Sequence, residues 1–155
     1  MPSDQRQRQS AIEQLESRIG CTLPADYREF LMHDDPLSYC YQVFPVSPAI
    51  GGSNQLPINL LCEAWCEPDE FSSVEANYEV LASREQGDGM LPPETVPIGD
   101  CVDDIYILLY VAGDRVGEVW IKDYIYLDEG KEDTPQEGLQ RVARSFTEFL
   151  GSLRE

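Results

Sequence analysis

The sequence predicts an α+β fold, a single domain over residues 1–155 in which helices pack on a curved, mostly antiparallel sheet. Helices are expected at the N-terminus, in the middle and at the C-terminus. Three observations predict this class. Apolar residues recur at helical spacing near both ends, β-branched and aromatic runs fill the second half, and helical and strand segments form separate blocks. A chain of 155 residues is long enough to bury one core without disulfides or metals.

Two helices are predicted at the N-terminus. The first carries a capping box at residues 10–13, could begin as early as Ser3, and stops at Gly20. Its apolar residues recur at helical spacing: Ile12, Leu15 and Ile19. The second begins at Pro24, because proline suits the first turn of a helix, and ends before Pro36. Its apolar face carries Tyr27, Phe30 and Leu31.

The middle of the chain mixes strands with one helix. Residues 39–46 are aromatic and β-branched and predict a strand, residues 47–55 a loop, and residues 58–61 a short strand. A helix is predicted to open at residues 67–70, whose carboxylates suit the positive end of its dipole. Its buried stripe would be Phe71, Val74, Tyr78 and Leu81. A turn-rich connector follows at residues 86–93.

The second half predicts sheet and then a terminal helix. Residues 96–98 form a short strand, and residues 105–111 are apolar throughout, as expected for a strand buried on both faces. Gly113-Asp114 marks a turn, residues 116–121 the returning strand, and residues 124–127 a third strand. The chain would close with a charged loop over residues 129–137 and a helix whose apolar face carries Leu139, Val142, Phe146, Phe149 and Leu150.

The charge is strongly negative and unevenly distributed. The chain has 29 acidic and 11 basic residues, a net charge of −18. Residues 34–137 hold 22 of the acids and four of the bases, whereas both ends are nearly balanced. Such a chain repels nucleic-acid phosphates and anionic membranes and attracts basic partners, although the same charge also serves solubility. We therefore expect a protein partner, no direct nucleic-acid binding and no membrane binding.

The cysteines and the N-terminus predict a cytoplasmic protein. The five cysteines are odd in number and fit no disulfide framework, which favours free thiols in a reducing compartment. The polar start leads into no apolar signal core, and no apolar run approaches the ~20 residues that span a bilayer. Whether the chain is a monomer or a dimer stays open.

No catalytic, metal or cofactor site is expected. His33 is the one histidine, and no nucleophile stands near it at a motif spacing. Cys62 and Cys66 lack the further ligands of a structural zinc site. The loop carboxylates after the Ile-Gly-Asp block lack the glycine and closing glutamate of a calcium loop. We therefore predict that the chain is not an enzyme.

Two acidic sets are the candidate partner-binding residues. One is a loop set, which reads otherwise as solvated carboxylates: Asp100, Asp103 and Asp104. The other surrounds a tryptophan, because aromatic residues ringed by charge are common at binding hot spots. It consists of Trp65, Glu67, Asp69 and Glu70, with Glu63 close by in sequence. The alternative for Trp65 is simple packing in the core.

Four blocks, in order, resemble the SUKH superfamily, which includes the Smi/Knr-type yeast cell-wall-assembly regulators and many bacterial toxin-immunity proteins. They are a helix ending in Ile-Gly followed by Leu-Pro and an aromatic helix, Val-Pro-Ile-Gly-Asp before an apolar strand, Gly-Glu-Val-Trp-Ile-Lys-Asp, and a closing Phe-Thr-Glu-Phe-Leu helix. They lie within residues 12–31, 96–111, 117–123 and 143–150. The chain departs from the family at residues 33–36 and 101–104, where glycines are common in the family.

This resemblance implies action by binding. Superfamily members neutralise diverse protein toxins, many of them nucleases, and are usually encoded beside the toxin. The resemblance therefore implies an immunity protein that meets a cognate, basic toxin through its acidic surface. The alternative is an intracellular regulatory or scaffold module of the same fold without a toxin partner. The departing loops are where partner specificity is expected, so the resemblance does not identify the toxin.

Overall fold

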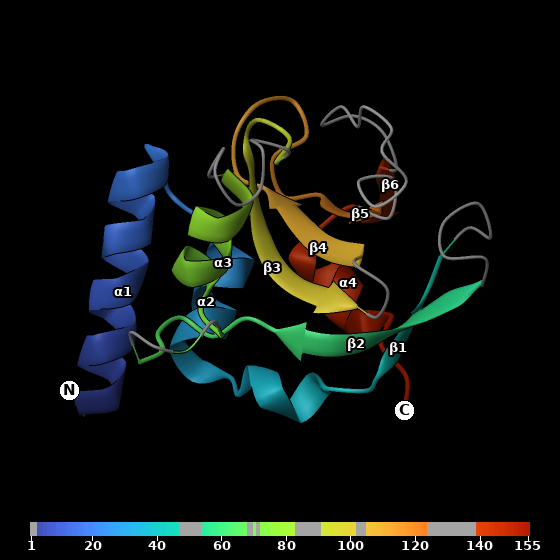
Figure 1. The fold of residues 1–155 in the computed structure, drawn as a ribbon, viewed down its shortest axis with the longest axis horizontal. Coiled ribbons are helices and arrows are strands. Elements are labelled where there is room, and N and C mark those ends of the chain that lie inside the picture. Colours follow the sequence, from blue (N-terminus) through green and yellow to red (C-terminus); the bar gives the residue numbers. More distant parts are fainter. Residues whose placement is uncertain are drawn as a thin grey trace.

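The computed structural model confirms the α+β class (Figure 1). It describes residues 3–46, 54–67, 70, 72–82, 91–101, 105–123 and 139–155. Within these residues the elements follow one another in this order: α1 (Ser3–Ile19), α2 (Ala25–His33), the 3-10 helix η1 (Pro36–Tyr39), β1 (Val43–Pro45), β2 (Gln55–Leu61), α3 (Val74–Ala82), β3 (Thr95–Cys101), β4 (Ile105–Tyr110), β5 (Val119–Asp123), β6 (Leu139–Ala143) and α4 (Phe146–Gly151).

The strands form one antiparallel sheet in the order of the chain, β1 to β6. Each strand pairs with the next, and the sheet curves around the core (Figure 1). The predicted curved antiparallel sheet is therefore confirmed. β4 lies at its centre and is almost wholly buried, as its apolar sequence predicts. A turn containing Gly113 and Gly117, both at positive φ, separates β4 from β5, so the returning strand begins at Val119 rather than at residue 116.

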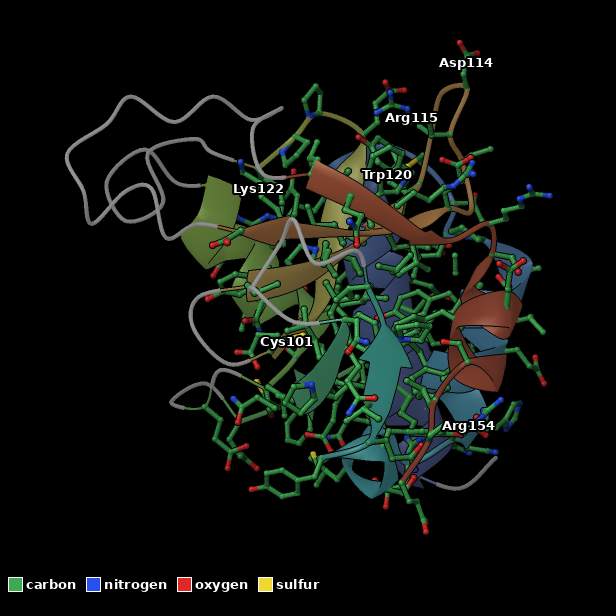
Figure 2. All side chains as sticks on the ribbon, turned by 90° about the vertical axis from the view of Figure 1, so that its right-hand side faces the viewer. Cys101, Asp114, Arg115, Trp120, Lys122 and Arg154 are labelled. Carbon is green, nitrogen blue, oxygen red and sulfur yellow. The ribbon has the colours of Figure 1, made fainter. Side chains whose placement is uncertain are left out.

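Aromatic side chains connect α2 to α4 and α4 to β1 in the core. The ring centroid of Phe146 in α4 lies 4.8 Å from that of Tyr27 and 4.8 Å from that of Phe30, both in α2. Phe149 packs edge-on against Phe44 of β1. Such contacts stabilise a core beyond the area that they bury. Figure 2 shows how densely side chains fill the space between the sheet and these helices.

The two N-terminal helices form as predicted. α1 begins at Ser3, the earlier of the two starts considered, and ends before Gly20, whose φ of +78° favours glycine. Pro24 is the N-cap of α2. The apolar face of α2 is buried as expected through Tyr27, Phe30 and Leu31.

The predicted strand over residues 39–46 is mostly wrong. Only Val43–Pro45 is strand, and the preceding residues form η1, which begins with a proline and is capped by Asp35 accepting a hydrogen bond from the Leu37 amide at 3.1 Å. Tyr41 has a φ of +70°, a left-handed conformation that interrupts any strand. β2 begins at Gln55, earlier than predicted. The predicted loop lies mainly outside the described residues.

The middle helix begins later than predicted. α3 starts at Val74, where the Ser73 hydroxyl accepts a hydrogen bond from the Ala76 amide at 3.1 Å. Glu67 and Glu70 therefore lie in the loop before the helix and not in its first turn. Phe71 lies outside the described residues, as do most of the connector predicted after α3, the strand predicted at 124–127 and the charged loop.

The prediction of a terminal helix is wrong for its first part and correct for its second part. Residues 139–143 form β6, paired with β5, and the helix begins only at Phe146. The Ser145 side chain caps α4 by accepting a hydrogen bond from the Glu148 amide at 3.0 Å. Leu139 and Val142 fit a helical spacing, but the open edge of β5 offers backbone hydrogen bonds that decide for a strand.

Candidate partner-binding site

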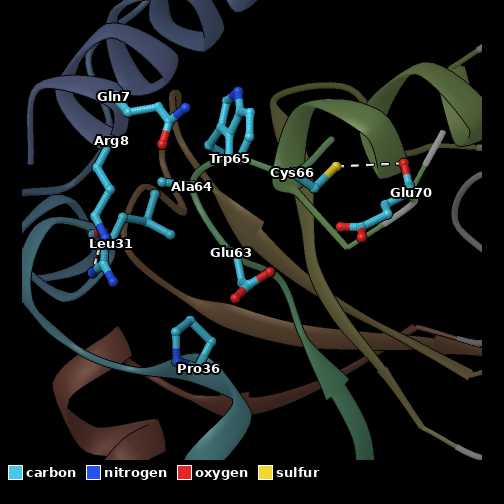
Figure 3. Close-up of a pocket in the computed structure, with 9 residues that line it drawn as sticks. All are labelled: Gln7, Arg8, Leu31, Pro36, Glu63, Ala64, Trp65, Cys66 and Glu70. Atoms are coloured by element: carbon cyan, nitrogen blue, oxygen red, sulfur yellow. Dashed lines mark hydrogen bonds between the residues drawn. The ribbon is translucent and has the colours of Figure 1, made fainter. Parts of the chain in front are cut away.

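Trp65 lies in the loop between β2 and α3, beside a surface hollow of about 240 Å³ (Figure 3). Its side chain is 39% exposed, so the alternative of packing in the core is wrong. The wall of the hollow comes from four parts of the chain: α1, α2, η1 and this loop. We call it the Trp65 hollow, and its polar and rim residues are Gln7, Arg8, Pro36, Glu63, Trp65 and Glu70.

Backbone hydrogen bonds hold the loop that carries Trp65. The Glu63 amide donates to the Ser72 carbonyl at 2.7 Å, and the Val74 amide donates to the Glu63 carbonyl at 3.0 Å. The Ser72 hydroxyl donates to the Glu63 carboxylate at 3.1 Å. The Glu70 amide donates to the Glu67 carbonyl at 2.9 Å. The two ends of the loop are therefore tied together, and Trp65 is presented from a fixed base.

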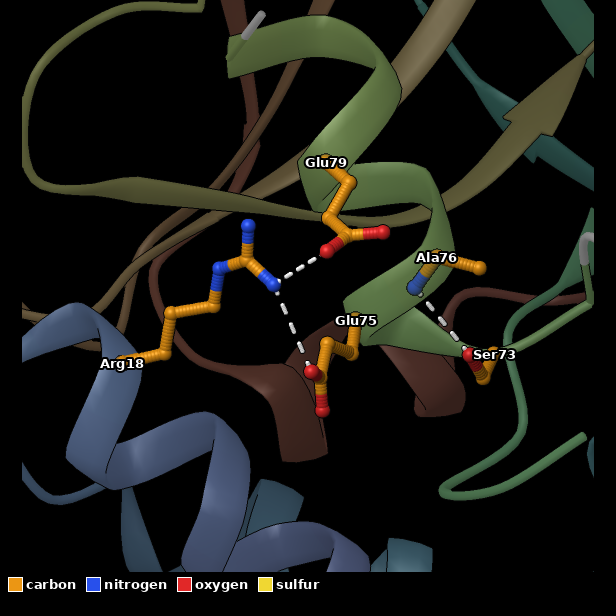
Figure 4. A network of polar contacts seen from close by, with 5 residues as sticks. All are labelled: Arg18, Ser73, Glu75, Ala76 and Glu79. Atoms are coloured by element: carbon orange, nitrogen blue, oxygen red, sulfur yellow. Dashed lines mark hydrogen bonds and ion pairs between the residues drawn. The ribbon is translucent and has the colours of Figure 1, made fainter. Parts of the chain in front are cut away.

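The helix after this loop is fixed to α1. The Arg18 guanidinium of α1 pairs with Glu75 and Glu79 on α3 (Figure 4). It also lies 5.8 Å from the ring centroid of Tyr78. These glutamates raise the pKa of Arg18, mainly through the hydrogen bond to Glu79. The walls of the hollow that come from α1 and from the loop are thus held relative to each other.

Among the described residues that line the hollow, the charged groups are the carboxylates of Glu63 and Glu70 and the guanidinium of Arg8. Arg8 donates to the carbonyls of Leu31, Met32 and Asp34 at 3.4, 3.3 and 2.9 Å, at the C-terminal end of α2. It satisfies carbonyls that the helix leaves without partners. The Glu70 carboxylate, by contrast, has no hydrogen bond or ion pair with the rest of the described chain.

Further exposed apolar residues lie in η1 and directly after it, in the segment that follows Pro36 of the hollow. The described chain has four exposed large hydrophobic residues, and three of them lie in η1, directly after it or at the hollow: Leu37, Tyr41 and Trp65. Tyr41 is 79% exposed despite its positive φ. Its amide donates to the Ile58 carbonyl of β2 at 2.7 Å. A bulky side chain held outward in a strained conformation is typical of a functional position.

The SMI1/KNR4 family model, SUKH-1, matches residues 8–152, nearly the whole chain. The chain belongs to this family. The SUKH resemblance predicted from the four sequence blocks is therefore confirmed. No curated protein matches the chain significantly. In this SUKH-1 chain, none of the described helices combines the length and the apolar character that a bilayer crossing requires.

The second acidic set is only partly described. Asp100 lies in β3 opposite Leu60 of β2, is half-buried, and accepts a hydrogen bond from the Asn59 side chain at 3.0 Å. Burial raises the pKa of Asp100, and the hydrogen bond from Asn59 opposes this increase. Asp103 and Asp104 lie outside the described residues, as does Asp69 of the first set. Whether these residues contact a partner stays a prediction.

The described members of the two sets lie on different elements. Asp100 sits within the β2–β3 ladder, whereas Glu67 and Glu70, both exposed, lie in the loop beyond the end of β2 with Trp65. Sequence reasoning identified Trp65 and Glu70 but missed Leu37, Tyr41 and the wall supplied by Arg8. One available signal was the departure from the family pattern at residues 33–36, which leads directly into η1 and its exposed residues.

Reactive side chains do not converge in the described part of this SUKH-1 chain. His33 is exposed at the end of α2, with Nε2 3.4 Å from the Glu29 carboxylate and Nδ1 3.4 Å from the Gln5 side chain. Burial raises the pKa of the Cys62 thiol far above its ordinary range and that of Cys101 to about 12, so both thiols are protonated. The described residues hold no group of histidines, cysteines and carboxylates placed to bind a metal ion.

The second tryptophan, Trp120, lies on β5 in a cluster that the chain completes itself (Figure 2). The Arg115 guanidinium lies 4.7 Å from the centroid of the Trp120 ring and 5.6 Å from that of Tyr110. Trp120 Nε1 donates to Glu118 at 3.0 Å, and Arg141 lies 3.5 Å from the same carboxylate. We call this the Trp120 cluster, and it consists of Tyr110, Arg115, Glu118, Trp120 and Arg141.

Proposed function

We propose that this SUKH-1 chain is an immunity protein that binds and neutralises a cognate, basic protein toxin in the cytoplasm, and that it acts by binding and not by catalysis. The observation that carries the proposal is Trp65, an exposed tryptophan beside a hollow that also holds Glu63 and Glu70, in a chain with a net charge of −18. Tryptophan is among the residues most often responsible for binding energy at protein interfaces.

The charge supports a basic partner. A surface rich in carboxylates attracts a positively charged protein over several ångströms and raises the rate at which the two meet. A nuclease fits this description, because the face that binds nucleic-acid phosphates is basic. Buried apolar anchors then set how long the complex lasts, because differences in affinity reside mostly in the dissociation rate.

The apolar residues along η1 support a surface of sufficient size. A stable protein interface buries roughly 800 Å² on each partner. The hollow alone is too small for this, but Leu37 and Tyr41, which follow Pro36 of the hollow in the chain, are also exposed and would add to the area if the partner covers η1 as well. An apolar centre with a polar rim is the usual organisation of a specific interface.

Co-expression with the toxin encoded beside the chain in its native host tests the proposal. We expect the chain to restore growth and to co-purify with the toxin. Trp65→Ala should lower the affinity about thirtyfold, the size of a hot-spot loss of about 2 kcal/mol. The matched control is Val116→Ser, which changes an exposed apolar residue on the β4–β5 turn and should leave the affinity within about twofold. Failure to restore growth, or equal losses in both variants, contradicts the proposal.

The salt dependence of binding tests the electrostatic part separately. We expect the association rate to fall steeply between low and physiological salt, where the Debye length is about 8 Å. Glu70→Gln should lower that rate, because the Glu70 carboxylate lies at the hollow, whereas Asp114→Asn removes one charge at the exposed β4–β5 turn and should not. An association rate that does not change with salt argues against steering by charge.

The family match fits a second function equally well. The chain matches the SMI1/KNR4 family, and this match alone does not distinguish an immunity protein from a regulatory or scaffold module. A regulatory or scaffold module of this fold would also act by binding. The two functions differ in the partner. An immunity protein protects cells from a toxin encoded beside it, whereas a regulatory module has no such neighbour and its loss leaves toxin sensitivity unchanged.

A further inference from the structure

The Trp120 cluster shows which groups this chain places around an indole, and it can be compared with the Trp65 hollow. In the cluster, one guanidinium lies over the indole at 4.7 Å, and a carboxylate accepts a hydrogen bond from the indole at 3.0 Å. Arg115 also donates to the Tyr110 hydroxyl at 3.2 Å, which fixes its orientation. The combination of aromatic face, carboxylate and guanidinium is therefore one that this chain itself forms.

The Trp65 hollow has two of these three components. The indole of Trp65 is exposed, and the carboxylates of Glu63 and Glu70 line the same hollow (Figure 3). The cation–aromatic contacts of the described chain involve Tyr78, Tyr110 and Trp120, and none involves Trp65. Arg8 also lines the hollow, but its hydrogen bonds to three carbonyls hold it at the end of α2.

We propose that the Trp65 hollow receives an arginine side chain of the partner protein, with its guanidinium between the Trp65 indole and the carboxylates of Glu63 and Glu70. This inference rests on the proposed function and specifies the residue that the toxin inserts. Arginine fits better than lysine, because a planar guanidinium can stack on an aromatic face while it donates to carboxylates from its edge.

The other occupants are less favourable. An apolar side chain would cover Glu63 and Glu70 without offering them a donor, which desolvates both carboxylates and leaves that of Glu70 without any hydrogen bond from the described chain. An acidic side chain would be repelled by the same two groups and by the net charge of −18. Counted over the described lining residues Glu63, Glu70 and Arg8, the hollow has one excess negative charge, which one entering guanidinium balances.

A titration with single amino-acid probes tests the inference without the toxin. The full chain, labelled with nitrogen-15, gives one indole N–H signal for each of Trp65 and Trp120, assigned with Trp65→Phe. We expect N-acetyl-arginine amide to shift the Trp65 signal in a saturable way, about tenfold more tightly than N-acetyl-citrulline amide, its uncharged isostere. The Trp120 signal should not respond, because Arg115 already covers that ring.

Three variants make the titration specific. Glu63→Gln combined with Glu70→Gln should remove the preference for arginine over citrulline at Trp65, whereas Asp114→Asn, an exposed carboxylate at the β4–β5 turn, should preserve it. Arg115→Gln should make the Trp120 signal respond to arginine, because it uncovers an indole beside Glu118. Equal responses to arginine and citrulline at Trp65, or a preference for arginine that survives the double substitution, overturn the inference.

The toxin assay separates this inference from the proposed function. A chain that neutralises the toxin but shows no preference for arginine at Trp65 overturns the inference alone. A chain that prefers arginine at Trp65 but neither binds nor neutralises the adjacent toxin overturns the proposed function and leaves the arginine site standing.

Discussion

Both tryptophans of this SUKH-1 chain lie beside carboxylates, but among the described residues only Trp120 also has a guanidinium of the chain over its ring. Trp120 lies on β5 among Tyr110, Arg115 and Glu118, all supplied by the chain itself. Trp65 lies beside carboxylates in a loop, and its ring has no cation over it within the described residues. The difference teaches that the residue type does not decide the role. A tryptophan whose partners come from its own fold stabilises that fold, and one that lacks them is available to another molecule.

Strand pairing explains why the chain itself supplies the neighbours of Trp120. Trp120 is paired with Leu108 of β4 and with Arg141 of β6, so the ladders fix which side chains lie beside it. Trp65 follows the end of β2, where none of the described strands pairs with its loop segment to determine what covers its ring. The loop is tied through Glu63 and Ser72 instead, which fixes its base and leaves the indole exposed.

The largest expected effect is on stability. Trp120→Ala should lower the free energy of unfolding by about 2 kcal/mol, because it removes a half-buried indole, its contact with Tyr110 and the cation over its ring. Trp65→Ala should cost about half as much, because Trp65 has no such partners among the described residues. Urea denaturation of both variants measures the difference. A larger loss for Trp65 than for Trp120 would show that Trp65 serves the fold after all.

Tyr41, another exposed aromatic residue, is expected to lower the stability of the fold because its backbone is left-handed. A left-handed conformation costs a bulky residue about 1–2 kcal/mol, and glycine avoids this but loses more chain entropy on folding. Tyr41→Gly should therefore raise the free energy of unfolding by about 0.5–1 kcal/mol while it weakens binding of the toxin. Thermal unfolding and a binding titration measure the two effects.

Glu94 is the matched control for Tyr41, because its φ of +69° is nearly the same and it lies directly before β3, whereas Tyr41 follows η1. Glu94→Gly should also relieve the backbone, and the toxin should bind it as tightly as the unchanged chain. If both variants bind the toxin equally well, Tyr41 is strained for some reason other than the partner.

Arg115 tests how much the guanidinium contributes to the Trp120 cluster. Arg115→Gln removes a cation over two aromatic rings and a hydrogen bond to Tyr110, and should lower the free energy of unfolding by about 0.5–1 kcal/mol. Arg144→Gln is a suitable control, because Arg144 is exposed and has no hydrogen bond or ion pair among the described residues. Urea denaturation in low and high salt distinguishes them, since only the Arg115 variant should differ from the unchanged chain.

The sequence predicted the elements whose limits are set locally. Gly20 ends α1 and Pro24 begins α2, because each residue favours one backbone conformation regardless of distant contacts. β4 was predictable for a similar reason: its apolar run suits only a strand buried on both faces. The family resemblance added the order of the elements and was confirmed over residues 8–152.

The remaining elements depend on distant partners. Residues 139–143 fit a helical spacing and became a strand because β5 offers an open edge. α3 begins at Val74 because Glu63 pairs with Ser72 and Ser73 across the loop, a contact that no local pattern reveals. The site follows the same division. A tryptophan among acidic residues predicted a binding region around Trp65. The exposure of Leu37 and Tyr41 was not predictable, because it follows from where η1 packs.

The smallest expected effect concerns Asp100 of the second acidic set. Because burial raises its pKa above the ordinary 3.8, Asp100 favours folding when protonated, and this contribution is lost as the pH rises through the pKa of the folded state. Asp100→Asn should therefore make the chain slightly more stable at neutral pH, and the gain should disappear as the pH falls towards 3.8. Asparagine keeps the acceptor for the Asn59 side chain. Urea denaturation across this pH range measures the effect. The same variant sharpens the comparison of sites: if the toxin binds mainly at the Trp65 hollow, Asp100→Asn must weaken binding less than Glu70→Gln does, and the reverse order would move the interface to the β2–β3 ladder.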